Sequence, residues 1–305
     1  MATMLSGVLP VDKPPGPTSH DVVAAVRRAA GQRRVGHAGT LDPPASGLLI
    51  LLLGSATRLQ SYVMGADKTY SFHLVLGIAT DTLDMDGEVA ETAVLRCPEP
   101  SEVEAAARSL VGDVELRPPM VSAVHHQGER LYRLARRGEE VDRPARHSRI
   151  ERLSLLGDAV PGPRDGAWSV PMEVCCSSGT YIRSLGEELA RRLSVPGCID
   201  RLRRLSSGTF SVAGAAGLRE LASGGRAAVA ERLLPPETAV AELPLVELED
   251  AWASGFRHGS PVTVGSAPDG EVRARCGTQF LGIGLVRSGW LAPRIVLAEE
   301  QAQDG

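Results

Sequence analysis

The chain has 305 residues, of which 43% are hydrophobic and 23% are charged, an ordinary balance for a globular enzyme. Its length exceeds that of a typical domain, which predicts one large domain and a small one. The net charge of −4 argues against a uniformly basic nucleic-acid-binding surface, although a local one stays possible. No signal peptide pattern is present, and no apolar run approaches the roughly 18 residues of a membrane-spanning helix.

Metal and cofactor chemistry has no sequence support. The five cysteines show neither C-x-x-C spacing nor an even number for pairing, so we expect no zinc site, no disulfides and a reduced, cytoplasmic compartment. The chain has no phosphate-cradling glycine loop and no nucleotide fingerprint. We therefore expect an activity without metal or cofactor.

The N-terminal residues predict a strand followed by a helix. Residues 7–12 are apolar, and 13–17 form a proline-rich, rigid turn. Thr18 and Asp21 fit a capping box, and valines at helical spacing predict a helix over about 19–30.

A single carboxylate, Asp42, stands in a turn rich in glycine and proline. The apolar run 48–53, closed by Gly54, predicts a short strand buried on both faces. Asp42 would therefore lie on a stiff loop anchored to the core, which suits a reactive group. Taken alone, an Asp-Pro pair is more often a structural turn than a catalytic site.

Further along, strands alternate with helices. Residues 68–78 alternate with a period of two, which predicts a strand with one buried face. The acidic stretch 81–88 lacks the last ligand and the flanking helices of a calcium loop, so its Asp86-Gly87 pair predicts a hairpin turn. Ser101 and Glu104 fit a capping box for a helix that runs to about residue 110.

The second half begins with a basic segment. Residues 117–152 contain nine arginines and five acidic residues, a net charge of +4. A strand over 168–176 and a helix to about residue 193 follow, and then a stretch rich in glycine and alanine at 213–230. The composition shifts around 237–245, which predicts a small C-terminal β-rich domain. The whole pattern predicts an α/β protein of the α+β type with a mixed sheet.

A resemblance to a known family rests on the turn around Asp42. It closely resembles the catalytic motif of the TruB family of pseudouridine synthases, the bacterial enzymes that make pseudouridine 55 in the T loop of transfer RNA. The matching residues are Gly36-His37-Ala38-Gly39-Thr40-Leu41-Asp42-Pro43, followed by Ala45-Ser46-Gly47-Leu48-Leu49. The Asp-Lys-Pro segment at 12–14 and Gly-Thr-Tyr-Ile-Arg at 179–183 are similar to the family as well. The resemblance covers roughly 7–210 with specific motifs and continues more loosely to 298.

The resemblance also implies the architecture. A pseudouridine synthase catalytic fold with a mixed, largely antiparallel sheet would occupy 1–236, a PUA-like RNA-binding domain 237–298, and a tail 299–305. Segment 117–152 aligns with the family's RNA-gripping insertion, which suits its interleaved arginines. Within it, Val121 and His125 replace a Tyr and a Lys of the family pattern.

The same resemblance implies roles for individual residues. Asp42 would be catalytic, and Arg183 would pair with it and lower its pKa. Tyr70 would stack on the target uracil, an interaction typically worth roughly 1–3 kcal/mol per base. Tyr181 and Leu202 would line the uracil pocket.

His37 and several cations would contact RNA. By itself His37 could be a buried histidine, a metal ligand or an RNA contact, and no Cys or second His stands at ligand spacing. The resemblance implies that His37 fills the stack that the flipped base leaves. The predicted RNA contacts are Lys13, Arg130, Arg133, Arg136 and Arg203.

The leading hypothesis is therefore a monomeric enzyme that isomerises uridine 55 of transfer RNA. One alternative is a transfer-RNA binding and folding protein with incidental catalysis. Another is the catalytic subunit of a guide-RNA-directed complex, which typically has lysine-rich terminal extensions. The sequence leaves open whether Asp42 attacks C6 of the uracil, attacks C1′ of the ribose, or removes a ribose proton.

Overall fold

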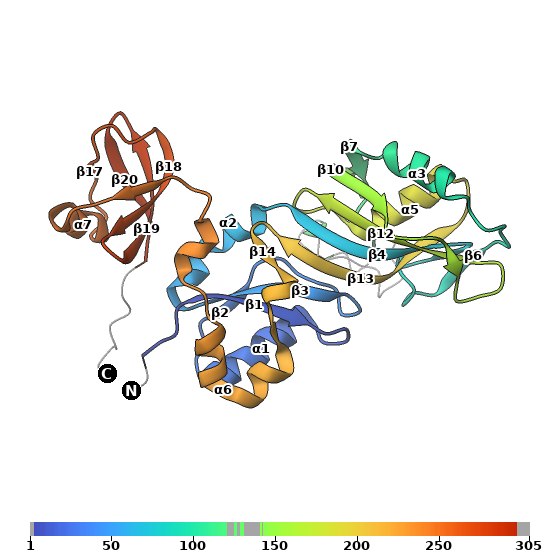
Figure 1. Ribbon diagram of the computed structural model, residues 1–305, viewed down its shortest axis with the longest axis horizontal. Helices are drawn as coiled ribbons and strands as arrows, with labels where there is room; N and C mark the ends of the chain where they lie inside the picture. The colour runs from blue at the N-terminus through green and yellow to red at the C-terminus, as the bar shows by residue number, and fades with distance from the viewer. Residues whose placement is uncertain (1–2, 121–124, 127–128, 131–140, 142, 298–305) are drawn as a thin grey trace. The chain divides into compact units, whose positions relative to one another are not determined.

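The computed structural model describes residues 3–120, 125–126, 129–130, 141 and 143–297. The chain divides into two compact units. The first comprises Met1–Pro43, Leu48–Gly65 and Phe210–Gly305, and the second Pro44–Gly47 and Ala66–Thr209. Both consist of sheets covered by helices (Figure 1). The sheets are mixed and largely antiparallel, which confirms the predicted fold class.

The first unit begins with the predicted strand and helix, β1 (Gly7–Lys13) and α1 (Ser19–Ala30). The predicted capping box is confirmed, because the Thr18 hydroxyl accepts from the Asp21 amide and the Asp21 carboxylate accepts from the Thr18 amide. Helix α1 packs against α6 (Leu218–Arg232), and Figure 1 shows both helices on one side of the strands.

Strand β3 (Ser46–Leu53) carries the core of this unit. Its residues from Leu48 to Leu53 are at most 1% exposed, which confirms a strand buried on both faces. The antiparallel strand β2 (Val35–His37) pairs with its end, and β1 pairs in parallel with β15 (Ala216–Gly217). The short remaining elements are η1 (Gly54–Leu59), α2 (Gln60–Gly65), β14 (Phe210–Ser211), η2 (Val212–Gly214) and η3 (Pro236–Val240).

The C-terminal residues of the first unit form a second sheet with the strand order β16-β18-β19-β20-β17. Strand β19 is its central strand and pairs in antiparallel fashion with β18 and β20. At Gly282, φ is 137° and an added Cβ would lie 1.9 Å from the Ile295 oxygen, so the close approach of β19 and β20 requires glycine. The elements are β16 (Leu245–Glu247), α7 (Asp250–Arg257), β17 (Val262–Thr263), β18 (Gly270–Cys276), β19 (Gln279–Arg287) and β20 (Trp290–Val296).

The second unit contains an antiparallel sheet in the order β13-β4-β12-β10-β7. Its central strand β4 pairs along its length with β12 and β13. Helices α3 (Pro100–Arg108) and α5 (Ile182–Arg192) contact each other and cover one face (Figure 1). The strands are β4 (Lys68–Leu76), β7 (Gly112–Leu116), β10 (Arg146–Leu155), β12 (Trp168–Cys176) and β13 (Gly197–Ser207).

Five short strands complete this unit. Strands β5 (Ile78–Thr80) and β6 (Val89–Thr92) form the predicted hairpin, with Asp86 and Gly87 in a connection longer than a two-residue turn. The others are β8 (His125–His126), β9 (Glu129–Arg130) and β11 (Val160–Pro161).

Three helices differ from what the sequence predicts. Helix α3 begins at Pro100 and is capped by Glu99 with Glu102, not by Ser101 with Glu104. A proline suits the first helical position because it has no N–H to leave unpaired there. Helix α6 occupies the stretch rich in glycine and alanine, where we predicted no helix, and it is kinked at Gly225. Helix α7 was not predicted either.

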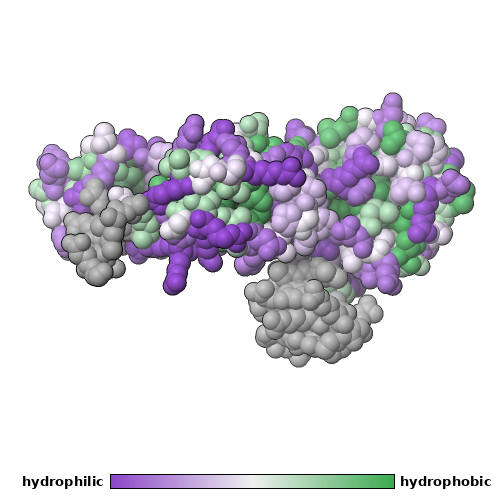
Figure 2. Space-filling model, turned by 90° about the horizontal axis from the view of Figure 1, so that it is seen from below, coloured by the Kyte–Doolittle hydropathy of each residue, from purple (hydrophilic) through white to green (hydrophobic). Residues whose placement is uncertain are grey.

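Among the described residues on the face drawn in Figure 2, apolar patches alternate with hydrophilic ones. Scattered exposed apolar residues such as Val94 and Leu156 are normal for a folded protein. None of the helices in the described part of the chain has the length and apolar content needed to cross a membrane.

Candidate active site

The loop that carries Asp42 is held at both neighbours of this residue. On one side, the buried Ser19 hydroxyl donates to the Leu41 oxygen at 3.0 Å and accepts from the Leu41 nitrogen at 2.9 Å. On the other side, the Pro43 oxygen accepts from the Gly16 nitrogen at 2.8 Å and from Lys13 Nζ at 3.0 Å. Asp42 itself is half-buried. The first turn of α1 and the turn before it therefore fix the backbone on both sides of Asp42. A preorganised site requires such support for its carboxylate.

Lys13 has a different place from the predicted RNA contact. Its side chain is fully buried, and Nζ donates to the Pro14 oxygen at 3.0 Å as well as to Pro43. A buried ammonium with backbone acceptors stabilises the fold of this turn and offers no charge to solvent. In this structure Lys13 supports the Asp42 loop.

His37 lies at the end of β2, in the same unit as Asp42. Its backbone oxygen accepts a hydrogen bond from Gln60 Nε2 at 2.8 Å. Its ring meets the ring of His20 edge-on, with centroids 5.3 Å apart. This edge-on contact gives His20 a structural part beside His37.

Arg183 lies in the first turn of α5 and is 5% exposed. Its Nη1 donates to the Thr82 oxygen at 2.9 Å and lies 3.6 Å from the Asp84 carboxylate. Tyr181 precedes the helix as its N-terminal flanking residue. The guanidinium is therefore held by the turn between β5 and β6, which none of the sequence motifs of the site includes.

Asp84 is the functional candidate that sequence reasoning missed. Its Oδ1 accepts from the Thr82 hydroxyl at 2.6 Å, and backbone bonds of Leu83 and Met85 with Ile199 fasten the turn to β13. Burial raises the pKa of the Asp84 carboxyl, and its bond from Thr82 and the charge of Arg183 oppose that shift. The signal in the sequence is the acidic stretch 81–88, which predicts a hairpin turn but does not by itself point to Arg183.

The other predicted residues of the second unit lie on two neighbouring strands. Tyr70 is buried on β4, opposite Arg204 of β13. Strand β13 has an irregular register between Asp200 and Arg203, and Leu202 falls within this bulge. A bulge re-aims side chains locally. The structure thus brings the strand positions of Tyr70, Leu202 and Arg203 close together.

The arginines of this strand differ in exposure. Arg203 is half-buried, whereas Arg204 is only 1% exposed and is therefore not placed to meet phosphates. Arg203 and Arg204 pair in parallel with Ser46 and Gly47 at the start of β3. A Cβ on Gly47 would lie 2.2 Å from the Arg204 oxygen, so this pairing requires the glycine of the Asp42 motif.

Lys68 and Lys13 are the only lysines among the 33 lysines and arginines of the chain, and both are buried. Lys68 begins β4, and its Nζ donates to the Ala66 oxygen at 2.6 Å. Burial, together with the nearby charge of Arg204, lowers the pKa of Lys68 to about 8. Exposed cations of this protein are thus arginines.

Predicted site residues fall into two groups, one in each unit. The first unit holds Lys13, His37 and Asp42, and the second holds Tyr70, Tyr181, Arg183, Leu202 and Arg203. The predicted pairing of Arg183 with Asp42 joins residues of different units and stays a prediction. Arg133 and Arg136 lie outside the described residues, and Arg130 is described only as part of strand β9.

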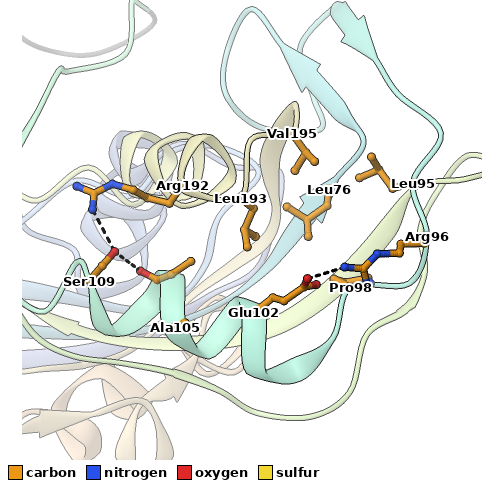
Figure 3. A pocket seen from close by; sticks show the side chains of 11 residues that line it. Leu76, Leu95, Arg96, Pro98, Glu102, Ala105, Ser109, Arg192, Leu193 and Val195 are labelled. Carbon is orange, nitrogen blue, oxygen red and sulfur yellow. Dashed lines mark hydrogen bonds and ion pairs between the residues drawn. The ribbon is translucent and has the colours of Figure 1, made fainter.

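A cavity of about 550 Å³ lies in the second unit between β4, α3 and the end of α5 (Figure 3). Leucines and alanines line it, and two contacts lie at its rim, Arg96 with Glu102 and Arg192 with Ser109. It contains none of the predicted site residues. Across the described ranges, no group of three or more His, Cys, Asp or Glu side chains could hold a metal ion.

Two family comparisons match this chain. Residues 27–182 match the N-terminal domain of the TruB family pseudouridylate synthases, and residues 244–297 match the C-terminal domain described as pseudouridine synthase II TruB. The second match covers the sheet of β16 to β20.

Curated relatives extend the match over most of the chain. A protein named tRNA pseudouridine synthase B from Symbiobacterium thermophilum is 46% identical over 85% of this chain and 83% of its own length. The protein of the same name from Thermobifida fusca is 41% identical over 97% of this chain and 99% of its own.

Among solved structures, the chain resembles one described as a Cbf5-Nop10-Gar1 complex, with a TM-score of 0.71 and 25% identity over 96% of this chain and 85% of that one. An H/ACA RNP bound to a substrate RNA containing 2′-deoxyuridine gives the same TM-score at 22% identity, over the same shares of the two chains, and shows the fold alone. With the family match over half of the sequence and relatives above 40% identity, the chain belongs to the TruB family of pseudouridylate synthases.

Proposed function

We propose that this protein isomerises uridine 55 to pseudouridine in the T loop of transfer RNA, with Asp42 as the catalytic carboxylate acting on a flipped-out uridine. The name shared by its relatives, tRNA pseudouridine synthase B, supports the reaction and the substrate class. The observation that carries the assignment of Asp42 is its loop, in which both flanking residues are fixed by buried donors.

The chemistry makes few demands on the protein. The N1–C1′ bond breaks, the freed uracil turns, and a C5–C1′ bond forms, while C5 loses a proton to solvent and N1 gains one. No electron or phosphate is transferred. One carboxylate acting as nucleophile or base suffices if its position is fixed and the base is trapped away from water.

The remaining roles follow the family resemblance. Tyr70 stacks on the uracil, Tyr181 and Leu202 line its pocket, and Arg183 pairs with Asp42. The structure supports Arg183 in this part, because a guanidinium held by Thr82 and Asp84 is preorganised.

RNA binding and the setting of the enzyme belong to the same proposal. His37 takes the vacated place in the T loop. Phosphates are contacted by Arg203 and by Arg130, Arg133 and Arg136 of the segment 117–152. The catalytic domain spans 1–236 and the PUA-like domain 237–298. The enzyme acts as a monomer in the cytoplasm.

The reaction can be tested by release of tritium from T stem–loop RNA that carries [5-³H]uridine at position 55, since only replacement of the C5–H bond frees the label. We expect release by the wild-type protein and none by Asp42→Asn. Asp158→Asn makes the same change at an exposed residue and should retain the wild-type rate. Release by Asp42→Asn at the wild-type rate would overturn the catalytic assignment.

The substrate and the folding alternative are tested with the same proteins. RNA with label only at other uridines, and cytidine at position 55, should release nothing; release from it would contradict the position. If Asp42→Asn still binds the RNA and promotes its folding, binding and folding are separable from catalysis. A wild-type protein that does so without releasing tritium would favour the folding protein instead.

A further inference from the structure

The segment between β7 and β10 contains most of the predicted RNA contacts, and both of its ends are described. Strands β7 and β10 pair in antiparallel fashion up to Leu116 opposite Arg146. The chain continues beyond Leu116 with Arg117, Pro118 and Pro119. Prolines have no N–H to donate, so the ladder does not continue through them, and the carbonyls there need other donors.

Two side chains from different elements supply those donors. Arg143 Nη1 donates to the Pro118 oxygen at 2.9 Å, which joins the two ends of the segment. The Ser184 hydroxyl donates to the Arg117 oxygen at 2.5 Å. We call these two hydrogen bonds, from Arg143 to Pro118 and from Ser184 to Arg117, the segment anchor. It lies beyond the last backbone pair of β7 and β10, so it fixes the chain ends where the ladder has stopped.

The segment anchor connects the segment to the helix of the predicted site. Ser184 is 3% exposed and directly follows Arg183 on α5. These two neighbours point to different partners, since Arg183 binds the turn of Thr82 and Asp84 while Ser184 binds Arg117. One helical turn therefore holds both the site arginine and the start of the segment.

The surroundings agree with this arrangement. Glu187, one turn further along α5, has its pKa raised by burial, and the positive charges of Arg143 and Arg117 counter that shift, so both arginines lie near this turn of the helix. Arg117 and Ser184 also line a cavity of about 810 Å³. Leu116 and Pro118, the neighbours of Arg117, are buried, so the two hydrogen bonds add to packing that already holds this backbone.

We propose that Arg143 and Ser184 are positioning residues that hold the two ends of the RNA-binding segment on the helix that carries Arg183. The proposal rests on the proposed function for the identity of the RNA. Arg143 then differs from the other arginines of 117–152, because its guanidinium fixes a backbone carbonyl and does not neutralise a phosphate. Its loss should displace the segment's RNA contacts relative to Arg183.

The first test separates position from charge. The dissociation constant of T stem–loop RNA is measured at several salt concentrations, in the Asp42→Asn background that prevents turnover. For Arg143→Ala we expect about tenfold weaker binding with an unchanged salt dependence, whereas losing one phosphate contact lowers the slope of log K against log salt by about 0.7–0.9. Arg149→Ala removes the same charge from an exposed position of β10 and gives the electrostatic reference. A slope for Arg143→Ala reduced by that amount would make Arg143 a phosphate contact and overturn the proposal.

The second test uses the hydrogen bond of the segment anchor whose donor is uncharged, that from Ser184 to Arg117. Ser184→Ala should raise KM for the RNA about five- to tenfold and leave kcat within about twofold, because the hydroxyl holds the segment and not the reacting base. Ser184→Thr keeps the hydroxyl and should restore KM. A fall in kcat with KM unchanged would show that Ser184 acts only through Arg183, which contradicts the proposal.

The third test needs no RNA. Hydrogen–deuterium exchange at amides of 112–117 and 146–150 should be faster in Arg143→Ala and in Ser184→Ala than in the wild type. The loss of RNA-binding free energy in the double variant should not exceed the sum of the losses in the two single variants. Unchanged exchange in both variants, or faster exchange with unchanged RNA affinity, would overturn the proposal. If the wild-type protein forms no pseudouridine, the proposed function is wrong. The exchange result would still test the segment anchor.

Discussion

Asp42 and Arg183 are held in different ways. The Asp42 loop is fixed through its backbone, since Ser19 binds Leu41 and Lys13 binds Pro43. Arg183 is fixed through its own side chain, by a carbonyl of Thr82 and the carboxylate of Asp84. A backbone pinned by hydrogen bonds depends little on the titration of carboxyl groups, whereas a guanidinium beside a carboxylate depends on the charge of that group. The two regions should therefore respond differently to substitution and to pH.

The largest effect is expected at Lys13. Lys13→Met removes a buried donor and leaves the Pro14 and Pro43 carbonyls without it, which should lower kcat on the order of 100-fold and the free energy of unfolding by about 2–4 kcal/mol. Tritium release and urea denaturation measure the two. The fractional loss of activity should be the same at every pH between 6 and 8. A variant with wild-type kcat would show that the loop does not depend on this side chain.

A smaller but pH-dependent effect is expected at Asp84. Asp84→Asn should lower kcat by about 30-fold at neutral pH, because Arg183 loses its anionic partner. Burial raises the pKa of Asp84, so in the wild type this anion is lost on acidification at a higher pH than for an ordinary Asp. The acid limb of the kcat profile should therefore flatten in Asp84→Asn. Asp86→Asn is the matched control at an exposed residue of the same turn, and an equal loss there would remove the special role of Asp84.

Ser19 tests the other anchor of the Asp42 loop. Ser19→Ala removes both hydrogen bonds to Leu41 and should lower kcat by about tenfold and the free energy of unfolding by about 1–2 kcal/mol, again without changing the pH profile. Ser101→Ala, at an exposed position of α3, should change neither quantity. A shifted pH profile for Ser19→Ala would contradict the distinction between the two regions.

The last effect concerns stability at alkaline pH and not kcat. Lys68 has a pKa of about 8 in the folded protein, against its ordinary value of 10.5. Between these values the unfolded chain binds a proton that the folded protein has released, so stability rises with pH. Relative to Lys68→Met, the wild type should gain about 1–3 kcal/mol of unfolding free energy between pH 8 and 10.

The titration itself can be observed directly. Because the chain has only two lysines, ¹³C-labelled lysine should give two side-chain resonances, and Lys68→Met identifies the one that is lost. A Lys68 resonance that titrates only near 10.5 would refute the depressed pKa.

Local sequence determined several elements correctly. The capping box of Thr18 and Asp21, the apolar run of β3 and the alternation of β12 all specify their structure through near neighbours in the chain, and the structure agrees with each. Two helices, α3 and α6, were predicted wrongly or not at all. The predicted start of α3 was wrong because Pro100 takes the first helical position. Helix α6 was not predicted because its glycines disfavour a helix, which packing against α1 stabilises.

The candidate site divides along the same line. The sequence singled out Asp42, Tyr70 and Arg183 only through its resemblance to the motifs of the TruB family. Only the tertiary structure placed Ser19 against Leu41, Lys13 inside the turn and Asp84 beside Arg183, since each contact joins residues from about 20 to 100 positions apart. Such contacts depend on how strands and helices pack, and no local pattern records them. Burial, likewise a property of the fold, is what separates Lys13 and Lys68 from the exposed arginines.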